Sequence, residues 1–295
     1  MKALFHKKFL EHNIDSDSEG AYRLLSYMDT YEAAPWTGEP YLNLVHTDRY
    51  IEYIKDACER GDFVAEVQLT PASYQAACLA VGLTIQASEH GDFAVVRPPG
   101  HHAGRERAAG FCFFNNIAIA VQKLVNEGKR VFIFDIDGHH GDGTQSIFYE
   151  TDQVYYCSIH QHYAYPFTGF PDETGTGVGA GFTTNFPMIS GSGDKDFLVT
   201  VDKAISLARR FNPDIIAVSA GFDAYYKDKL LGLQLTQKAY YECAFRLRRA
   251  FSNIFAVLEG GYHNDLKECI DSFIEGIQKG AQPPTMKWDT DMSIG

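Results

Sequence analysis

The chain has 295 residues, of which 45% are hydrophobic and 22% are charged, and this balance excludes a wholly disordered protein. Its 38 Asp and Glu residues outnumber its 26 Lys and Arg residues, so the formal net charge is −12. That charge argues against a nucleic-acid-binding protein, which needs clustered basic side chains to neutralise phosphates. It is compatible with a cationic substrate.

The predicted elements alternate between helices and short apolar strands. In chain order they are helix Ala21–Glu32, helix Asp48–Arg60, helix Ala72–Glu89, strand Phe93–Arg97, helix Asn115–Glu127, strand Arg130–Ile136, strand Gln153–Ile159, helix Asp196–Phe211, strand Asp214–Ala220, helix Thr236–Phe251, strand Asn253–Leu258 and helix Asn264–Lys279. Asp48 and either Asn115 or Asn116 are candidate helix caps, and Gly128 is a stop signal.

The strands are almost wholly apolar, as in Val131–Phe134, and this pattern favours a parallel sheet that is covered on both faces. The alternation predicts an α/β protein with a single doubly wound domain over residues 1–295. The glycine-rich run Gly175–Gly181 does not join a strand to a helix as a nucleotide-binding loop does. We interpret it as a flexible connection into Thr183–Pro187.

Targeting signals are not evident in the sequence. The first residues, Met-Lys-Ala-Leu-Phe-His-Lys-Lys, lack the apolar run of a signal peptide, and no stretch approaches the 18 apolar residues of a membrane-spanning helix. The six cysteines are scattered and form no C-x-x-C pair, which argues against a zinc knuckle. We therefore expect a cytoplasmic protein with buried, reduced thiols and no membrane partner.

Polar side chains follow five of the predicted strands, at the point where each strand ends. The polar segments are Pro98–Gly104, Asp135–Gly143, His160–His162, Gly221–Asp223 and Glu259–His263. The carboxyl ends of parallel strands meet at one edge of a sheet, where ligands bind in doubly wound folds. The sequence therefore predicts a functional site at this edge.

Two carboxylates and an imidazole in this set indicate a metal site. Asp135, Asp137 and His139 are spaced by two residues, so on an extended segment they point to the same side. Buried acids of this kind are costly unless a cation compensates their charge. We expect Asp137 and His139 to supply two ligands, and Asp223, the only acid at the end of its strand, to supply the third. Such a set suits a catalytic zinc ion with one open position.

The adjacent pair His101 and His102 indicates acid–base chemistry. Two consecutive residues cannot easily face one metal ion, but each can face a carboxylate behind it and a substrate in front. Asp135 and Asp142 are available as those carboxylates, and a His–Asp pair suits a general base that acts on water. The phenol of Tyr262, which follows two glycines, could donate a hydrogen bond to an oxyanion.

Together these residues resemble the zinc-dependent histone deacetylase family, including its bacterial deacetylase-like and acetylpolyamine amidohydrolase members. The resemblance extends from about Val45 to Ile277 and rests on five segments in the family's order: Arg97–Ala103, Gly110–Asn116, Asp135–Gln145, Ser219–Ala224 and Leu258–Tyr262. The Ser-Ala-Gly-Phe-Asp form and the Glu before Gly260 are similar to the class II side of the family.

The resemblance implies a role for each polar residue at the sheet edge. The implied roles are zinc ligands for Asp137, His139 and Asp223, general base and later acid for His102, transition-state partner for His101, carboxylate partners for Asp135 (to His101) and Asp142 (to His102), and carbonyl-polarising phenol for Tyr262. Some family members carry His at the last position and are weakly active towards acetyl-lysine. Tyr262 therefore predicts a competent enzyme, with iron(II) left open as an alternative to zinc.

The resemblance also implies structural potassium sites and a substrate tunnel. One potassium site would use the carbonyls of Asp135, Asp137, His139 and Ile159 with Ser158, and a second would use Phe148, Thr151 and Val154. The tunnel would be lined by Gly110, Phe111 and Tyr165, where the sequence reads Tyr-Pro-Phe-Thr-Gly rather than the commoner Tyr-Pro-Gly-Thr-Gly. Leu230 or Leu231 lies where a cation-selective Glu would help.

The favoured function is hydrolysis of an N-acyl-lysine amide to an amine and a short acid. An acetylpolyamine amidohydrolase would use the same chemistry, and the absence of a selective Glu and of a long dimerisation loop argues against it. Arginase-like chemistry would need two manganese ions and more bridging carboxylates, and an inactive acyl-lysine-binding protein would not need the full catalytic set. The sequence leaves open the physiological substrate, the preferred acyl length and the oligomeric state.

Overall fold

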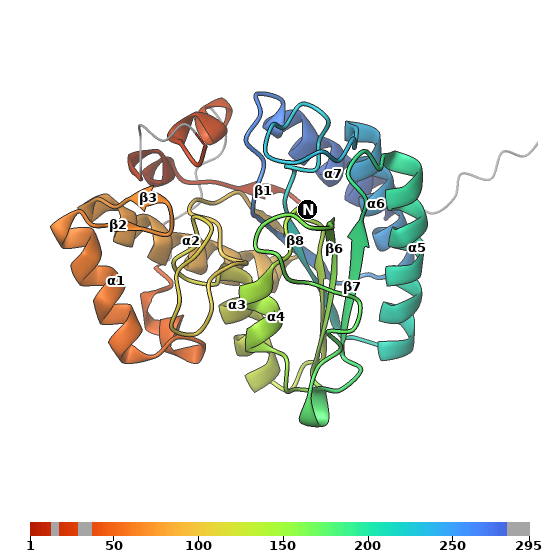
Figure 1. Ribbon diagram of the computed structural model, residues 1–295, viewed down its shortest axis with the longest axis horizontal. Coiled ribbons are helices and arrows are strands. Elements are labelled where there is room, and N and C mark those ends of the chain that lie inside the picture. The colour runs from red at the N-terminus through yellow and green to blue at the C-terminus, as the bar shows by residue number, and fades with distance from the viewer. Residues whose placement is uncertain (13–17, 29–36, 282–295) are drawn as a thin grey trace, which may run out of the picture.

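The computed structural model describes residues 1–12, 18–28 and 37–281 (Figure 1). Within these residues the main sheet has seven strands, all parallel, in the order β1-β4-β9-β8-β5-β6-β7. The strands are β1 (Ala3–Leu4), β4 (Phe93–Ala94), β5 (Val131–Asp135), β6 (Val154–Gln161), β7 (Thr183–Met188), β8 (Ile215–Ala220) and β9 (Ile254–Leu258). A small antiparallel hairpin, β2 (Phe63–Val64) and β3 (Val67–Gln68), lies apart from this sheet.

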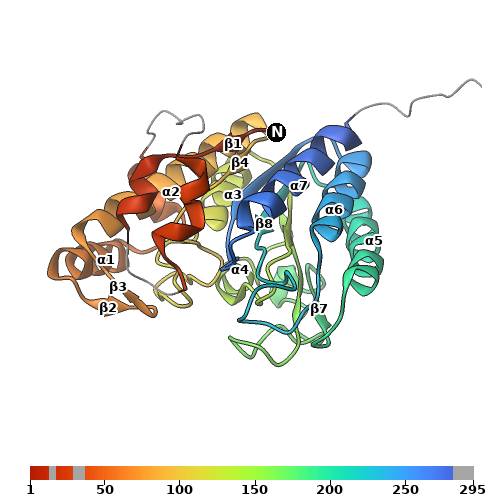
Figure 2. The ribbon, with the colours of Figure 1, turned by 90° about the horizontal axis from the view of Figure 1, so that it is seen from above.

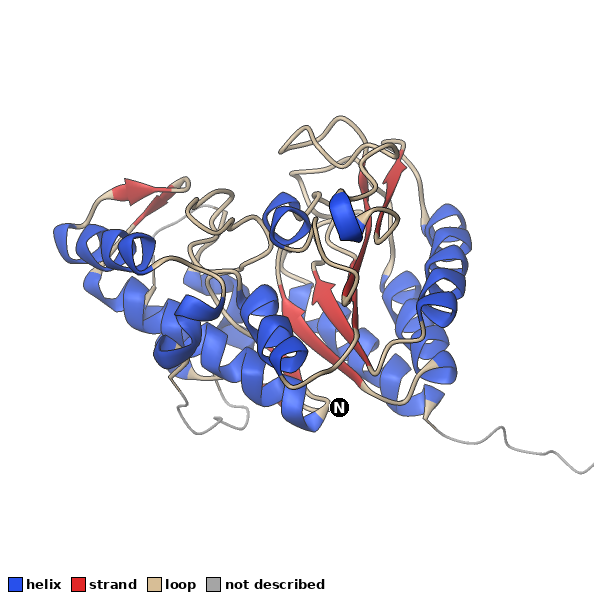
Figure 3. Ribbon diagram, turned by 90° about the horizontal axis from the view of Figure 1, so that it is seen from below, coloured by secondary structure: helices blue, strands red, loops and turns tan. Residues whose placement is uncertain are grey.

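Helices cover both faces of the main sheet, as the apolar strands require. The helices are α1 (Asp48–Arg60), α2 (Pro71–His90), α3 (Asn116–Asn126), α4 (Asp142–Ile147), α5 (Asp194–Phe211), α6 (Gln237–Ala250) and α7 (Leu266–Gly280). Figure 2 shows α5, α6 and α7 along one side of the sheet and α2 and α3 along the other, and Figure 3 shows the strands enclosed between them. Every residue of β5 and β9 is buried, so the core runs through the centre of the sheet. The predicted doubly wound α/β class is confirmed.

Most predicted elements lie within two residues of the observed ones, and their caps explain the boundaries. The Asn115 side chain accepts a hydrogen bond from the Ala118 N–H at 3.0 Å, so Asn115 is the cap and α3 begins at Asn116. At α1 the predicted cap is wrong by one position. Thr47 accepts from the Tyr50 N–H at 3.3 Å, and Asp48 is the first helical residue.

The amino-terminal helix is the clearest error in the predicted elements. Instead of an α-helix over Ala21–Glu32, the chain forms a 3₁₀ helix over Ala21–Tyr27, and residues 29–36 lie outside the described part. Further 3₁₀ segments are Lys7–Glu11, Glu39–Leu44 and Gly177–Gly179. The burial of Arg23 in this segment shows that tertiary contacts override its local pattern.

Five strands and helices, namely β1, β2, β3, β7 and α4, were not predicted, and one predicted strand is shorter than expected. β1 and α4 are too short to show a period, and β4 pairs only at Phe93–Ala94 rather than over Phe93–Arg97. β7 contains Pro187 and follows the glycine-rich run, so its sequence is not typical of a central strand. It lies at the edge of the sheet, where a proline costs no ladder hydrogen bond on its open side.

The sequence also predicted buried, reduced thiols and no membrane-spanning helix. All six cysteines lie within the described residues, and each is buried and free of disulfides. None of the described helices combines the length and the apolar character needed to cross a bilayer.

Candidate active site

The ends of β5 and β8 bring the predicted metal ligands together. Asp137, His139 and Asp223 each place a ligand atom within 4.8 Å of the other two. The Nδ1 atom of His139 lies 2.6 Å from Oδ2 of Asp223 and 3.4 Å from Oδ1 of Asp137. β5 ends at Asp135, so Asp137 and His139 lie on the following loop rather than on an extended strand.

The backbone around this cluster fits a cation. The Gly260 N–H donates to Oδ2 of Asp137 and the Gly138 N–H donates to Oδ1 of Asp223, both at 2.7 Å. A Cβ atom at Gly221 would collide with the Asp137 carboxylate, and one at Gly260 would collide with both carboxylates. The chain thus wraps closely around two oriented, buried carboxylates and one imidazole, a donor set that suits a divalent ion such as zinc.

The charges in the cluster support the same assignment. Burial opposes protonation of His139, but the carboxylates of Asp223 and Asp137 outweigh burial and raise the pKa of His139 to about 10. Burial and the nearby Asp137 charge raise the pKa of Asp223 to about 7. The carboxylates of Asp137 and Asp223 therefore stabilise a positive charge on the imidazole that lies between them. A metal ion bound at this position would supply that charge in place of the proton on His139.

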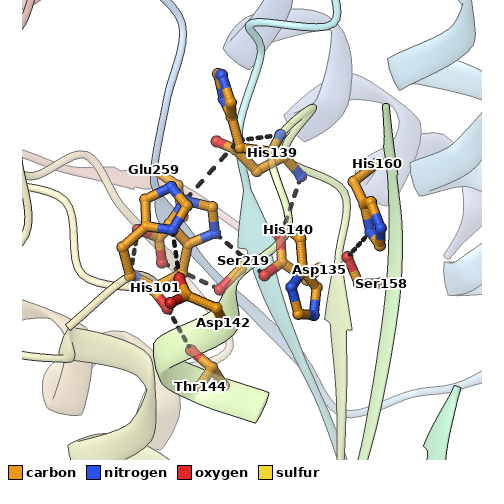
Figure 4. A network of polar contacts seen from close by, with 12 residues as sticks. His101, Asp135, His139, His140, Asp142, Thr144, Ser158, His160, Ser219 and Glu259 are labelled. Carbon is orange, nitrogen blue, oxygen red and sulfur yellow. Dashed lines mark hydrogen bonds and ion pairs between the residues drawn. The ribbon is translucent and has the colours of Figure 1, made fainter. Parts of the chain in front are cut away.

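His101 and His102 each face a different carboxylate. Figure 4 shows His101 near Asp135 and Asp142. Nδ1 of His101 lies 3.2 Å from Oδ2 of Asp135, and Nδ1 of His102 lies 2.8 Å from Oδ1 of Asp142. The Tyr156 hydroxyl also donates to Oδ2 of Asp135 at 3.0 Å. Both histidines are held in place from behind, so their rings are orientated before a substrate binds.

The environments of the two histidines push their pKa values apart. Burial disfavours charge on His101, but Asp137 and Asp135 outweigh it and raise the His101 pKa well above its usual range. Burial and the adjacent positive charge of His101 lower the His102 pKa to about 4, although Asp142 opposes the shift. These shifts favour a neutral His102, which can accept a proton, beside a protonated His101.

Arg107 is a site residue that the sequence did not indicate. Its guanidinium donates to Oδ2 of Asp142, the carboxylate behind His102. Burial would raise the pKa of Asp142, but the contacts with His102 and Arg107 outweigh burial and lower it to about 2. Asp142 thus stays ionised behind His102. Arg107 is an exposed residue on a loop, and no sequence pattern links it to Asp142, so this contact could not be predicted from the sequence.

Glu259 is a second site residue whose role the sequence did not indicate. The sequence showed only that a Glu at this position is similar to the class II side of the family. Its buried carboxylate accepts from the Gly100 N–H at 2.7 Å and from the His101 N–H at 3.1 Å. The Ser219 hydroxyl donates to its other oxygen at 3.0 Å. Glu259 therefore joins the turn that carries both histidines to the ends of β8 and β9.

Tyr262 is positioned by an arginine from the amino-terminal segment. The Arg23 guanidinium lies 4.8 Å from the centroid of the Tyr262 ring. Its Nε donates to the Gly261 carbonyl at 2.7 Å, and its Nη2 donates to the Glu259 carbonyl at 2.5 Å. The Tyr262 N–H donates to Asp228 at 2.7 Å. These contacts hold the turn on both sides of the phenol.

Glu19 completes this support by pairing with two buried arginines. Its carboxylate accepts from Arg97 Nε at 2.6 Å and from Arg23 Nη1 at 3.0 Å. Burial would raise the pKa of Glu19, but Arg97 and the other neighbours outweigh it and lower the pKa to about 2. Because the folded-state pKa lies below the unfolded value of about 4.3, this stabilisation is complete above that pH and is lost as the pH falls towards 2.

Replacing Glu19 with Gln is therefore expected to destabilise the protein by about 3–5 kcal/mol at pH 7, because two buried guanidinium groups lose their counter-charge. The free energy of unfolding should also depend less on pH between about 4 and 2 than in the wild type. Urea denaturation at several pH values measures both effects. Glu89→Gln, which removes an exposed partner of Lys123, is the matched control and should cost less than about 1 kcal/mol. Equal losses in the two variants would contradict this account.

A cavity of about 310 Å³ opens onto the cluster. It is lined by Glu66, His102, Gly110, Phe111, His139, Tyr165, Leu230 and Tyr262. Four of the residues predicted for a substrate tunnel, Gly110, Phe111, Tyr165 and Leu230, belong to this lining. Leu231, the alternative to Leu230, is half-buried and does not belong to this lining, and its Cδ1 lies against Gly138.

Glu66 is an acid at the cavity that the sequence did not reveal. It lies on the turn between β2 and β3, and its Oε2 accepts from the Gly110 N–H at 3.1 Å. The β2–β3 hairpin is remote in sequence from the strand ends of the main sheet that carry the site, so only the fold places Glu66 beside Gly110.

The residues of the two expected potassium sites lie on the neighbouring strands β5 and β6, with the loop that follows β5, and along a surface pocket. Asp135 and Ser158 are register partners on β5 and β6, and the Ser158 hydroxyl lies 2.8 Å from Nδ1 of His160. Nε2 of His160 faces the Gly169 carbonyl at 3.0 Å and so carries the proton, which makes Ser158 the donor to Nδ1. Phe148, Thr151 and Val154 lie together along a surface pocket of about 620 Å³.

Comparisons with known proteins agree with this geometry. Residues 12–277 match the model of the histone deacetylase domain. The chain is 39% identical over 236 residues to a probable deacetylase of Archaeoglobus fulgidus, covering 74% of this chain and 65% of that protein. It is 38% identical over 210 residues to acetylpolyamine amidohydrolase 1 of Pseudomonas aeruginosa, covering 68% of this chain and 61% of that protein. The chain thus spans less than two thirds of each of these relatives.

A solved structure supports the same relationship. The crystal structure of the HDA15 HD domain superposes with a TM-score of 0.88 at 30% identity, covering 97% of this chain and 90% of the other. The fold, the order of the site segments and the family match all agree. The chain therefore belongs to the histone deacetylase family.

Proposed function

We propose that this protein is a metal-dependent deacylase that hydrolyses N-acetyl-lysine and similar N-acyl amides. The observation that carries the proposal is the convergence on one cavity of the Asp137–His139–Asp223 cluster, a neutral His102 and the Tyr262 side chain. A zinc ion held by the cluster would polarise an amide carbonyl and lower the pKa of a water molecule, and iron(II) would supply the same chemistry.

The protein side chains then move the protons. His102 accepts a proton from the attacking water, and the Asp142 carboxylate stabilises the imidazolium that forms. Tyr262 donates a hydrogen bond to the oxyanion of the tetrahedral intermediate, and the charged His101 adds electrostatic stabilisation. His102 finally gives its proton to the leaving amine, so the products are a short carboxylic acid and a free amine.

Structural potassium ions complete the proposal. The carbonyls of Asp135, Asp137, His139 and Ile159 with the Ser158 hydroxyl would hold one ion beneath the catalytic loop, and Phe148, Thr151 and Val154 would contribute to a second. The pairing of Asp135 with Ser158 on neighbouring strands supports the first site, because it brings two of the expected ligands together. Neither ion would take part in a proton transfer.

Hydrolysis of acetylated polyamines is the second candidate. The Pseudomonas relative bears that name, and Glu66 places one acid at the cavity where a cationic chain would pass. Leu230 opposes this candidate, because it presents an exposed apolar side chain at the same opening. We therefore favour the acyl-lysine substrate.

The two candidates are separated by measuring kcat/KM on an acetyl-lysine peptide and on N-acetylspermidine with zinc-loaded enzyme. We expect the peptide to be favoured by at least about 10-fold, which corresponds to 1.4 kcal/mol of transition-state binding. A preference for acetylspermidine would reverse the order of the candidates. Absence of acetate release from both substrates would contradict the deacylase assignment.

A further inference from the structure

Phe167 combines a strained backbone with an exposed aromatic ring. Its φ angle is +65°, in the left-handed region where the Cβ atom of a bulky residue crowds the following carbonyl. Glycine would adopt this conformation without strain. The Phe167 side chain is 66% exposed, so burial in the core does not compensate for the strain.

The loop around Phe167 is fixed by its neighbours rather than by this ring. The Thr168 hydroxyl lies 2.8 Å from Nδ1 of the buried His140. The Gly169 carbonyl accepts from Nε2 of the buried His160 at 3.0 Å, and the Gly169 N–H donates to Glu173 at 3.0 Å. Strained residues persist where the surrounding structure determines the backbone in this way, and they concentrate at functional sites.

This loop forms one wall of the cavity mouth. Tyr165, two residues before Phe167, lines the cavity with its ring 5.2 Å from the His102 ring. The Phe167 N–H donates to the Ala164 carbonyl at 2.8 Å, which closes a turn around Tyr165. Tyr163, on the other side of Tyr165, also has a positive φ of +55° and is 75% exposed. The turn thus directs Tyr165 to the cavity and leaves an aromatic ring exposed on each side of it.

We infer that Phe167 is a specificity-determining residue, which contacts an apolar side chain next to the acyl-lysine of a polypeptide substrate. The inference rests on the proposed function. An acyl-lysine side chain that enters the cavity leaves its own backbone and the flanking residues across the mouth, beside the loop of Tyr165. An exposed ring on that loop gains apolar contact when such a chain binds. A small acylated amine ends inside the cavity and would not reach the ring.

The test compares KM and kcat for two acetyl-lysine peptides, one with Leu and one with Gly on both sides of the modified residue. Phe167→Gly is expected to raise KM for the Leu-flanked peptide by about 5- to 10-fold, the effect of losing a partly buried aromatic contact. Its kcat on that peptide and both constants for the Gly-flanked peptide should stay within about twofold of wild type. Phe167→Trp, which keeps an aromatic ring, should retain the low KM.

Two controls separate the ring from the backbone. Asn212→Gly introduces glycine at another residue with positive φ, the cap at the end of α5 before the amino end of the central strand β8, and should leave KM and kcat for both peptides unaffected. The melting temperature of Phe167→Gly should be equal to or above that of wild type, because the strain is removed. Should Phe167→Gly fail to fold, Phe167→Ala tests the same difference between the two peptides.

The outcomes distinguish this inference from the proposed function. If wild type hydrolyses neither peptide, the proposed function fails and the inference fails with it. If wild type hydrolyses both peptides, while loss of the ring changes neither KM or changes both equally, the inference alone is overturned. A selective rise in KM for the Leu-flanked peptide supports it.

Discussion

Asp223→Asn should yield a folded protein that retains little metal and loses nearly all activity. The substitution removes one of the two buried carboxylate charges that face His139, while an amide oxygen can still accept from the Gly138 N–H. We expect metal affinity to fall by about 100-fold or more and kcat/KM to fall by at least about 1,000-fold. Elemental analysis of the purified protein measures the bound metal directly, independently of activity.

The matched control for this loss is Asp142→Asn. Asp142 contacts His102 and Arg107 and does not belong to the three-residue cluster, so its variant should lose activity and keep its metal. Retention of a full equivalent of metal by Asp223→Asn would contradict the ligand assignment. The same measurement identifies the native metal, and two ions per chain would favour arginase-like chemistry instead.

Tyr262→Phe is expected to lower kcat by about 100- to 1,000-fold, the usual effect of removing one donor to a developing oxyanion. Burial raises the pKa of the Tyr262 phenol well above its usual range, so the group stays protonated and able to donate. The ring of the variant can still pack on Phe111, whose centroid lies 5.7 Å away, and beneath Arg23 at 4.8 Å. Bound metal and KM should therefore change little.

Tyr225→Phe is the control for Tyr262→Phe. It removes a phenol that donates to Asp265 at 3.0 Å rather than one that lines the cavity, and it should leave kcat within about twofold of wild type. The measurement is a steady-state profile of acetate release for the two variants. An unchanged kcat in Tyr262→Phe would remove this residue from the proposed mechanism.

The site could be anticipated in outline because strand ends are local features of a sequence. Apolar runs followed by acids and histidines identify both the strands and the edge where they end, and this logic placed His101, Asp137 and Asp223 in one site. Each is now found beside the cavity or the cluster. The pairing of His102 with Asp142 was also anticipated, because each residue belongs to a recognisable segment.

The supporting residues could not be anticipated, because their partners are remote in the chain. Arg23 reaches the Glu259 carbonyl across 236 residues, and Glu66 reaches Gly110 across 44. No periodicity or spacing encodes such contacts. The sequence also left Leu230 and Leu231 as alternatives, because only the fold of the loop places Leu230 in the cavity lining and Leu231 against Gly138.

By itself the sequence determined the α/β class, the sheet edge that carries the site and the chemical types of the site residues, because apolar periodicity and motif order are properties of neighbouring residues. Only the tertiary structure decided which histidine is neutral and which is charged, because burial and the distances to Asp135, Asp137 and Asp142 set their pKa values. It also decided that Phe167 keeps a left-handed backbone two residues after the cavity-lining Tyr165, since His140 and His160 hold the adjoining residues.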